Sequence, residues 1–444
     1  MNATENTNND GGNDEGIVEL HNAIRFKGLK EVKALLDAGA NPNAFSEDKG
    51  MEYMGALMTA VIGDKLDIVN ELVKNRGVSV NQIHKYGYTP LMRAVSYGRL
   101  EIAKVLLDHG ADVSMVDTLD KNNILIIAVE NANPDMVNLL LDHGADINQK
   151  GQYGRTALMA AVVKDNKSLV ELLLERKADI EAQAYYDRRT ALMDAASGND
   201  VEIIELLIKY GADIKTEDNN GRIALTHAAY SGSIDAAAAL LKHGADINKV
   251  DKEGETPFMH AAKQNQVAML KFLLNKGANK DHRNNDGLNA FILAAYWGAK
   301  GSVELLLEHE EDINQQCEYG RTALIWATYG NQLEVIRLLS EDAADVEKQD
   351  DAGLTALMYA VNRNHETFAH DFGSVISYNN EASNLPIFNL LVDVVQDFNL
   401  QNDAGQTALE IAKAAFGEIT PQFKDKKGDA FYTSVIAKLQ EKQK

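Results

Sequence analysis

Apolar and polar residues follow one another along this chain in a pattern that returns every 33 or 34 residues. One apolar residue anchors each copy of the pattern. The successive anchors are Leu57, Leu91, Leu125, Leu158, Leu192, Leu225, Phe258, Phe291, Leu324 and Leu357. A fixed period of this length predicts a stack of small units that share one continuous core, rather than a conventional globular domain.

Each copy contains the signals of two helices and a turn. In the copy over residues 87–114, apolar residues at helical spacing mark a first helix (Leu91, Ala94, Val95) and a second helix (Ile102, Val105, Leu106). Thr89 is placed to cap the first helix, and Pro90 suits its first turn. Gly87 fits a tight turn with a positive φ angle, and Gly110 ends the second helix. One such unit cannot bury its apolar face alone, so neighbouring units must stack.

The residues that open and close the copies are nearly the same along the chain. The openings include Tyr86–Leu91, Tyr153–Leu158 and Tyr319–Leu324, and the closings include Gly144–Asn148 and Gly244–Asn248. In these residues the chain resembles ankyrin repeats, over about residues 17–415. The resemblance implies an all-α repeat solenoid of stacked helix-turn-helix units with β-hairpin loops, curved with a concave binding face.

The two ends depart from the regular pattern. The distance from Leu357 to the next anchor, Leu409, exceeds one period, which places an insertion inside one unit. We expect a disordered tail at residues 1–16 and a single solenoid at 17–444, with twelve units including its caps. Within the solenoid we expect an N-cap repeat at 17–50, regular repeats at 51–362, the insertion at 363–384, and the last repeats with a C-terminal capping helix at 385–444.

The charge of the chain limits the classes of partner. With 44 basic and 66 acidic residues, the formal net charge is −22. This charge argues against nucleic acid as a direct ligand, because phosphate contacts need Lys and Arg, and against an anionic membrane surface. It would speed encounter with a basic protein, although an acidic surface also keeps a long solenoid in solution. The sequence has no apolar run of membrane-spanning length and no visible signal peptide, so we expect the protein in the cytoplasm, or inside a host cell if it is an effector. We also expect a monomer.

Catalytic and metal-binding motifs are absent from the sequence. There is no phosphate-binding loop, dinucleotide fingerprint, nucleophile elbow or paired Cys-x-x-Cys, so we expect neither enzymatic activity nor a cofactor. The single Cys317 excludes an internal disulfide and is expected to be an unreactive surface or half-buried thiol. His365 and His370 are five residues apart, whereas zinc ligation from one helix face needs a spacing of four. We therefore expect no metal site, and an enzyme built on the insertion is the weakest alternative.

Most other histidines, and several loop asparagines, follow the repeat. A histidine precedes the helix-ending turn, where a cation is favoured, at His109, His143, His243 and His309. The resemblance implies that His227 and His260, in first helices, bond to the hairpin backbone. Asn148, Asn248 and Asn314 resemble ankyrin asparagines that some animal hydroxylases modify. We expect their side chains to bond to the loop backbone.

Tyr, Trp and Arg recur at the positions that line the concave face in the ankyrin architecture, and these residue types dominate interface hot spots. Tyr296 and Trp297 adjoin at the end of one helix and mark the centre of this predicted surface, whereas Trp326 is expected in the core. The predicted partner-binding residues are Tyr86, Tyr88, Tyr97, Tyr153, Arg155, Tyr186, Arg189, Arg222, Tyr230, Tyr296, Trp297, Tyr319, Arg321 and Tyr329.

These features predict a non-enzymatic scaffold or adaptor that binds a protein partner on the concave face. Thr-Ala-Leu-Met variants, as at Leu158-Met159, resemble those of microbial ankyrin proteins and leave a microbial effector open. The acidic composition leaves a further alternative open, a dedicated inhibitor or immunity-type protein that neutralises a basic enzyme such as a nuclease.

Overall fold

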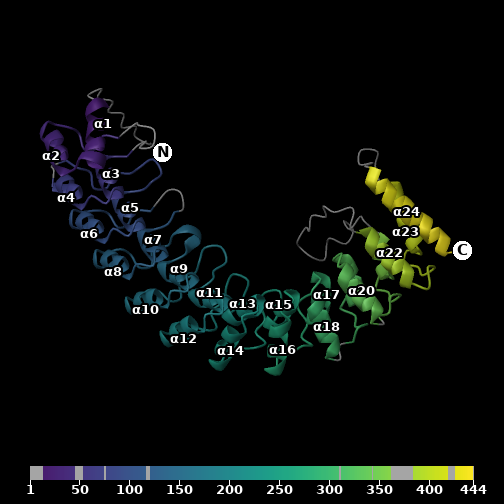
Figure 1. Ribbon diagram of the computed structural model, residues 1–444. Helices are drawn as coiled ribbons and strands as arrows, with labels where there is room; N and C mark the ends of the chain where they lie inside the picture. The colour runs from purple at the N-terminus through teal and green to yellow at the C-terminus, as the bar shows by residue number, and fades with distance from the viewer. Residues whose placement is uncertain are drawn as a thin grey trace. The chain divides into compact units, whose positions relative to one another are not determined.

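The computed structural model describes residues 14–45, 54–74, 77–116, 121–309, 312–342, 344–361, 384–418 and 426–443. They form pairs of short helices joined by loops (Figure 1), which confirms the all-α repeat fold. The helices fall into two compact units: Met1–Ala195 with Asp200–Asn219, and Ala196–Asn199 with Asn220–Lys444. The single uninterrupted solenoid and its internal boundaries stay a prediction.

The first unit contains α1 to α12. Their bounds are α1 Asp14–Asn22, the π-helical turn η1 Ala23–Lys27, α2 Leu29–Asp37, α3 Ala56–Ile62, α4 Leu66–Lys74, α5 Pro90–Ser96, α6 Leu100–Asp108, α7 Ile124–Glu130, α8 Pro134–Asp142, the 3-10 turn η2 Gln152–Gly154, α9 Ala157–Val163, α10 Lys167–Glu175, α11 Ala191–Gly198 and α12 Val201–Lys209. The last three residues of α11 are grouped with the second unit. α1 begins at Asp14, and the boundary of the disordered tail expected at residues 1–16 stays a prediction.

The second unit contains α13 to α24. Their bounds are α13 Ala224–Ser231, α14 Ile234–Lys242, α15 Pro257–Lys263, α16 Val267–Asn275, α17 Ala290–Trp297, α18 Lys300–Glu308, α19 Ala323–Tyr329, α20 Leu333–Glu341, α21 Ala356–Val361, α22 Asn384–Val394, α23 Ala408–Glu418 and α24 Lys426–Lys442. Residues 363–383 of the predicted insertion, with His365 and His370, lie outside the described residues.

Most of the described first helices begin where the sequence places a capping residue, although α3 and α13 begin without a side-chain cap. Thr89 has an extended backbone and its side chain accepts a hydrogen bond from the backbone N–H of Met92 at 3.2 Å, while Pro90 occupies the first helical position. Asn289 caps α17 in the same way, through the N–H of Ile292. Such caps satisfy N–H groups that have no partner inside a helix.

The helices form two rows in each unit (Figure 1). In the first unit, α3, α5, α7 and α9 contact one another in sequence, and α4, α6, α8, α10 and α12 do the same. The first helices bury almost all of their residues, whereas a second helix such as α6 buries one apolar face. Among the described helices, none combines the length and the apolar character that a membrane crossing requires.

Backbone hydrogen bonds between consecutive loops hold neighbouring repeats together. At the loop tips, the N–H of Tyr185 donates to the carbonyl of Tyr153 at 2.8 Å, and the N–H of Asn285 donates to that of Glu253 at 3.0 Å. Within the described residues these loops contain no β-strand, and Val116 and Asn123 form an isolated antiparallel bridge. The expected hairpins are therefore tight turns whose arms are too short to form strands.

The loop asparagines act as predicted. The side-chain oxygens of Asn148, Asn248 and Asn314 each accept a hydrogen bond from a backbone N–H of the following repeat, at 2.8, 2.9 and 2.7 Å. The helix-ending histidines differ in detail from the prediction. Nδ1 of His109 and of His143 lies 2.8 Å from the carbonyl oxygen four residues earlier, so a direct contact in the last turn accompanies any effect of the helix dipole.

The loop-tip glycine Gly254 has a second role besides its positive φ, because it lets the next repeat approach closely. A Cβ atom on Gly254, where φ is 76°, would lie 2.5 Å from Oδ1 and 2.8 Å from the backbone N of Asn285 in the next repeat. We expect Gly254→Ala to lower the free energy of unfolding by about 1–3 kcal/mol, from the left-handed backbone and the clash together. Gly405→Ala is the matched control, since its φ is 74° and nothing lies within 4 Å of its Cβ position. Equal losses in urea unfolding would show that the contact between tips contributes nothing.

Candidate functional site

The predicted partner-binding residues differ in how much of each side chain solvent can reach. Exposed residues are Tyr86, Tyr97, Tyr153, Tyr186, Tyr230, Trp297 and Tyr319. Half-buried residues are Tyr88, Arg155, Arg189, Arg222, Tyr296 and Tyr329. Arg321 is buried, so it can support this surface from beneath but cannot contact a partner directly.

In the first unit, two consecutive loop tips bring tyrosines and arginines together. We call this group, Tyr153, Arg155, Tyr185, Tyr186, Arg188 and Arg189, the tyrosine–arginine patch. The ring centroids of Tyr153 and Tyr186 lie 6.0 Å apart. Arg155 and Arg189 both contact the carboxylate of Asp194 in α11. Tyr86, Tyr88 and Tyr97 lie earlier in this unit, where Tyr88 stacks beneath the guanidinium of Arg93 at 3.8 Å.

In the second unit, aromatic rings contact one another from repeat to repeat. We call this group, Tyr296, Trp297, Trp326, Tyr329 and Tyr359, the aromatic ladder. The ring of Tyr296 stacks on Tyr329 with centroids 6.2 Å apart, and it meets the ring of Trp326 edge-on at 5.6 Å. Tyr329 in turn meets Tyr359 edge-on at 6.3 Å. Such offset and edge-on pairs stabilise beyond the area that they bury.

Tyr296 and Trp297 play different parts in the ladder. Tyr296 is half-buried between Trp297, Trp326 and Tyr329, and burial raises the pKa of its hydroxyl. Trp297 is 50% exposed, with the ammonium group of Lys263 5.3 Å from its ring centroid. Trp297 is therefore the side chain that a partner can reach, and Tyr296 holds it in place.

Trp326 is buried, as predicted from its place early in the helix. Its Nε1 donates to Sγ of Cys317 at 3.4 Å. The expectation of a surface or half-buried thiol is wrong, because Cys317 lies under the indole of Trp326 and is itself buried.

Arg321 and Asp350 close the far end of the ladder. The guanidinium of Arg321 lies 5.1 Å from the ring centroid of Trp326 and 5.7 Å from that of Tyr359. The hydroxyl of Tyr359 donates to Asp350 at 2.7 Å. Burial, together with this bond to a carboxylate, raises the pKa of Tyr359 far above its ordinary value, so the phenol stays neutral.

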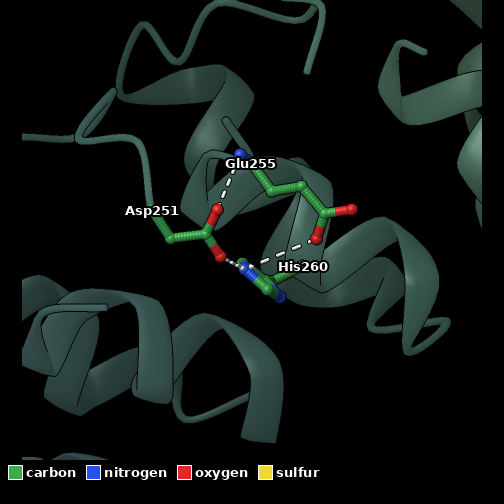
Figure 2. Close-up of side chains that lie close together, drawn as sticks. All are labelled: Asp251, Glu255 and His260. Carbon is green, nitrogen blue, oxygen red and sulfur yellow. Dashed lines mark hydrogen bonds and ion pairs between the residues drawn. The ribbon is translucent and has the colours of Figure 1, made fainter. Parts of the chain in front are cut away.

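One buried cluster joins two carboxylates and an imidazole at the start of α15 (Figure 2). Nε2 of His260 lies 2.8 Å from Oδ2 of Asp251 and 3.6 Å from Oε2 of Glu255. The other oxygen of Asp251 accepts the backbone N–H of Glu255 at 2.8 Å. The implied bond from His260 to the loop backbone is therefore wrong, because Asp251 offers a charged acceptor at the same place.

Two cations complete this cluster. Nε of Arg222, from the preceding repeat, lies 3.3 Å from Oδ2 of Asp251, and Nζ of Lys263 bonds to both oxygens of Glu255 at 3.0 and 2.9 Å. One nitrogen and two carboxylate oxygens are a donor set that a divalent metal could use. Here each carboxylate already has a cationic partner, and a metal would have to displace Lys263 and Arg222. The geometry fits an ion network that ties two repeats together.

Comparison with known proteins identifies the family of these repeats. The family model for ankyrin repeats, described as three copies, matches residues 20–117, 114–184, 181–251, 248–317 and 302–370. This chain belongs to the ankyrin repeat family. Ankyrin repeats indicate a protein–protein interaction scaffold, and the family is typically non-enzymatic.

Individual relatives match only part of the chain. An ankyrin repeat protein of Acanthamoeba polyphaga mimivirus is 36% identical over 106 residues, 23% of this chain and 64% of that protein. A protein of Rhinolophus ferrumequinum with ankyrin repeat, SAM and basic leucine zipper domains is 45% identical over 83 residues, 19% of this chain and 16% of that protein. The match thus spans less than two thirds of either relative. The crystal structure of the ankyrin repeat domain of Bcl-3, a member of the IkappaB family, has 28% identity and a TM-score of 0.45, and covers 48% of this chain and 97% of that domain.

Against the ankyrin pattern, one exposed residue escaped the sequence prediction. Tyr185 is 63% exposed but is absent from the predicted partner-binding residues, because it lies three residues before the turn residue Arg188, one position farther from the turn than Tyr186. The doublet Tyr185-Tyr186 is visible in the sequence and was the signal that could have found it. Ring contact with Lys150, whose Nζ lies 5.0 Å from the Tyr185 centroid, places it in the tyrosine–arginine patch.

Proposed function

We propose that this ankyrin repeat protein is a non-enzymatic adaptor that binds a protein partner on the loop tips and first-helix ends. The observation that carries the proposal is Trp297, a large aromatic side chain that is half exposed and whose ring packs edge-on against Tyr296. Tryptophan in such a setting supplies contact area at little entropic cost, which is how interface hot spots work. A monomer in the cytoplasm, or in a host cell if the protein is an effector, belongs to the same proposal.

The test uses Trp297→Ala. Wild-type and variant proteins serve as bait in pull-downs from the native source, and captured proteins are quantified by mass spectrometry. We expect at least one protein to be depleted from the variant, and its affinity to fall by more than about 1 kcal/mol in titration calorimetry. The melting temperature should change little, because Trp297 is half exposed.

Phe26→Ala is the matched control, because Phe26 is an exposed aromatic of the first unit that the proposal leaves out of the binding surface. Proteins that are depleted equally from both variants would indicate nonspecific binding to exposed aromatic rings. A partner whose affinity is unchanged by Trp297→Ala would contradict the proposed binding surface.

The inhibitor alternative is favoured by one observation, the net charge of −22. It requires a single tight and basic partner whose association rate falls steeply as salt is added. A partner of neutral or acidic character, or an association rate that salt does not change, would exclude it.

A further inference from the structure

Two exposed rings of the second unit belong to one packed surface. Tyr319, in a loop tip, is 38% exposed, and Trp297, at the end of α17, is 50% exposed. The guanidinium of Arg321 lies 5.6 Å from the ring centroid of Tyr319 and 5.1 Å from that of Trp326. The ring of Trp326 meets Tyr296 at 5.6 Å, and Tyr296 meets Trp297 at 5.4 Å. Exposed rings on a packed support offer contact area to another chain.

Three consecutive loop tips beside these rings each carry an exposed carboxylate in the same register. The carboxylates stand two residues before the tip glycines Gly320, Gly353 and Gly405, and we call these residues, Glu318, Asp351 and Asp403, the acidic tips. The N–H of Asp351 donates to the carbonyl of Tyr319, and the N–H of Asp403 donates to that of Ala352, both at 3.1 Å. Backbone bonds therefore hold the three carboxylates along one edge.

The loops that carry the acidic tips contain few basic residues. Loops 312–322, 344–355 and 395–407 hold eight acidic residues and two basic ones: Asp312, Glu318, Asp345, Glu347, Asp350, Asp351, Asp397 and Asp403 against Arg321 and Lys348. Nε of Arg321 lies 3.6 Å from Oδ2 of Asp350, and both side chains are buried. Lys348 has Asp345 and Glu347 as neighbours in its own loop. These loops therefore stay strongly acidic.

The loop before the acidic tips is close to neutral. With His282 neutral, residues 277–289 contain two basic and two acidic residues. Nζ of Lys280 lies 2.7 Å from Oδ1 of Asp281. Nη1 of Arg283 donates to a tip carbonyl at 2.7 Å, and Asp286 belongs to the same tip. This loop adds no net positive charge to the tip that follows.

The last helices and the side chains outside the described part do not reverse the charge either. The helices near the last tip carry both signs: Glu410 with Lys413 in α23, and Glu441 with Lys442 in α24. Residues 362–383 and 416–430, whose side chains lie outside the described part, contain four basic and six acidic residues. Their summed charge has the same sign as that of the acidic tips.

Two lysines near Trp297 each have a carboxylate partner. Nζ of Lys263, which lies 5.3 Å from the Trp297 ring centroid, bonds to both oxygens of Glu255 at 3.0 and 2.9 Å. Lys300 follows Trp297 by three residues, and its Nζ lies 3.8 Å from Oε1 of Glu304. Neither lysine brings an unbalanced positive charge to the exposed indole.

We propose that the acidic tips, Tyr319 and Trp297 bind a basic segment of a protein partner, in which Lys or Arg side chains meet Glu318 and Asp351 while a large apolar side chain packs on Trp297. The inference rests on the proposed function and names the chemistry of the partner segment. Charge complementarity selects this occupant, because an acidic segment, nucleic acid or a second copy of this chain would bring further negative charge to the carboxylates. The aliphatic stem of Lys or Arg can also cover the ring of Tyr319 while its charged head meets the carboxylates.

The experiment uses a phage-displayed library of random short peptides, selected on the full-length protein and counter-selected on Trp297→Ala. We expect the survivors to combine Lys or Arg with a large apolar residue. Synthetic copies should bind the tip variant, Glu318→Gln/Asp351→Asn, at least about tenfold more weakly than wild type, as expected when hydrogen bonds to charged groups are lost. Added salt should weaken the binding.

The matched control is Glu308→Gln/Glu334→Gln, which removes the same number of charges from exposed positions of the second helices α18 and α20. It should keep peptide affinity within about twofold of wild type, since solvent screens charges that do not touch the peptide. Both double variants replace exposed side chains, so their melting temperatures should stay near that of wild type. An oligolysine with the charge of a selected peptide should bind wild type more weakly than that peptide.

Survivors that are neutral or acidic would overturn this inference alone, since their dependence on Trp297 leaves the proposed function standing. The inference also falls if the control variant weakens binding as much as the tip variant, or if the oligolysine binds wild type as tightly as the selected peptides. Net charge alone would then explain the attraction. If no peptide survives counter-selection, the proposed binding surface fails together with this inference.

Discussion

Replacing Asp251 by Ala should lower the free energy of unfolding of the second unit by about 3–5 kcal/mol, the usual loss when one partner of a buried ion pair is removed. The carboxylate of Asp251 is 1% exposed and is shared by Arg222, His260 and two backbone N–H groups. Its removal leaves a guanidinium and both N–H groups without that acceptor. Because Arg222 belongs to the preceding repeat, the loss should weaken the contact between repeats.

Urea unfolding followed by tryptophan fluorescence reports on the second unit, since both tryptophans of the chain, Trp297 and Trp326, lie there. Glu253→Ala is the matched control, because it removes an exposed carboxylate from the same loop. It should change stability by no more than about 0.5 kcal/mol. Equal effects of the two substitutions would show that the buried network is not a stabilising element.

The same carboxylate predicts a dependence on pH. Burial would raise the pKa of Asp251, but the bond from His260, the backbone N–H of Glu255 and the nearby Arg222 outweigh it and hold the pKa below its ordinary value of 3.8. A lowered folded-state pKa gives stability that is present above the ordinary value and lost as pH falls through the folded value. The difference between wild type and Asp251→Ala should therefore be larger at about pH 5 than at about pH 3. A difference that grows on acidification would contradict this assignment.

The period of the sequence was enough to predict the fold because each repeat carries its own local signals. Thr89 and Pro90 determine a helix start through backbone geometry and one hydrogen bond, and both act as predicted. Trp326 was placed in the core from its register alone. Signals of this kind depend only on residues that are close in the sequence, so a single sequence is enough to identify them.

Whether a side chain of the candidate surface is exposed depends on contacts between repeats, and the repeat period of the sequence does not specify those contacts. Tyr296 and Trp297 are consecutive, but successive helical residues point about 100° apart. One ring turns toward Trp326 and Tyr329 of the next repeat, and the other turns to solvent. The sequence could place the pair at the surface, but it could not tell which residue supports and which contacts.

The buried ion network was missed for a related reason. Asp251 and His260 are nine residues apart, and the same spacing relates Cys317 to Trp326 and Asp350 to Tyr359, all of which contact each other. A loop residue and a helix residue thus meet at a fixed register whatever their chemistry. The resemblance to ankyrin repeats implied a histidine bonded to the backbone, whereas the partner of His260 is determined by this geometry rather than by proximity in the sequence.

Replacing Trp326 by Ala should destabilise the second unit by about 3–5 kcal/mol, the range for truncating a large buried aromatic residue. Its indole is 1% exposed, covers Cys317 and meets the rings of Tyr296 and Tyr329. The cavity would adjoin Arg321, whose guanidinium would lose one of its aromatic neighbours. Urea unfolding followed by the remaining Trp297 measures the loss.

Trp326→Phe is the control, since it keeps an aromatic ring at this position and removes the bond to Cys317, and it should cost less than Trp326→Ala. Comparison with Trp297→Ala then separates the two roles in the aromatic ladder. Trp297→Ala should lose partner affinity at nearly constant melting temperature, because Trp297 is half exposed. Trp326→Ala should lose stability first and affinity only through Tyr296, which rests on Trp326 and orients Trp297. If Trp326→Ala kept its stability while Trp297→Ala unfolded the unit, the assignment of support and contact would be reversed.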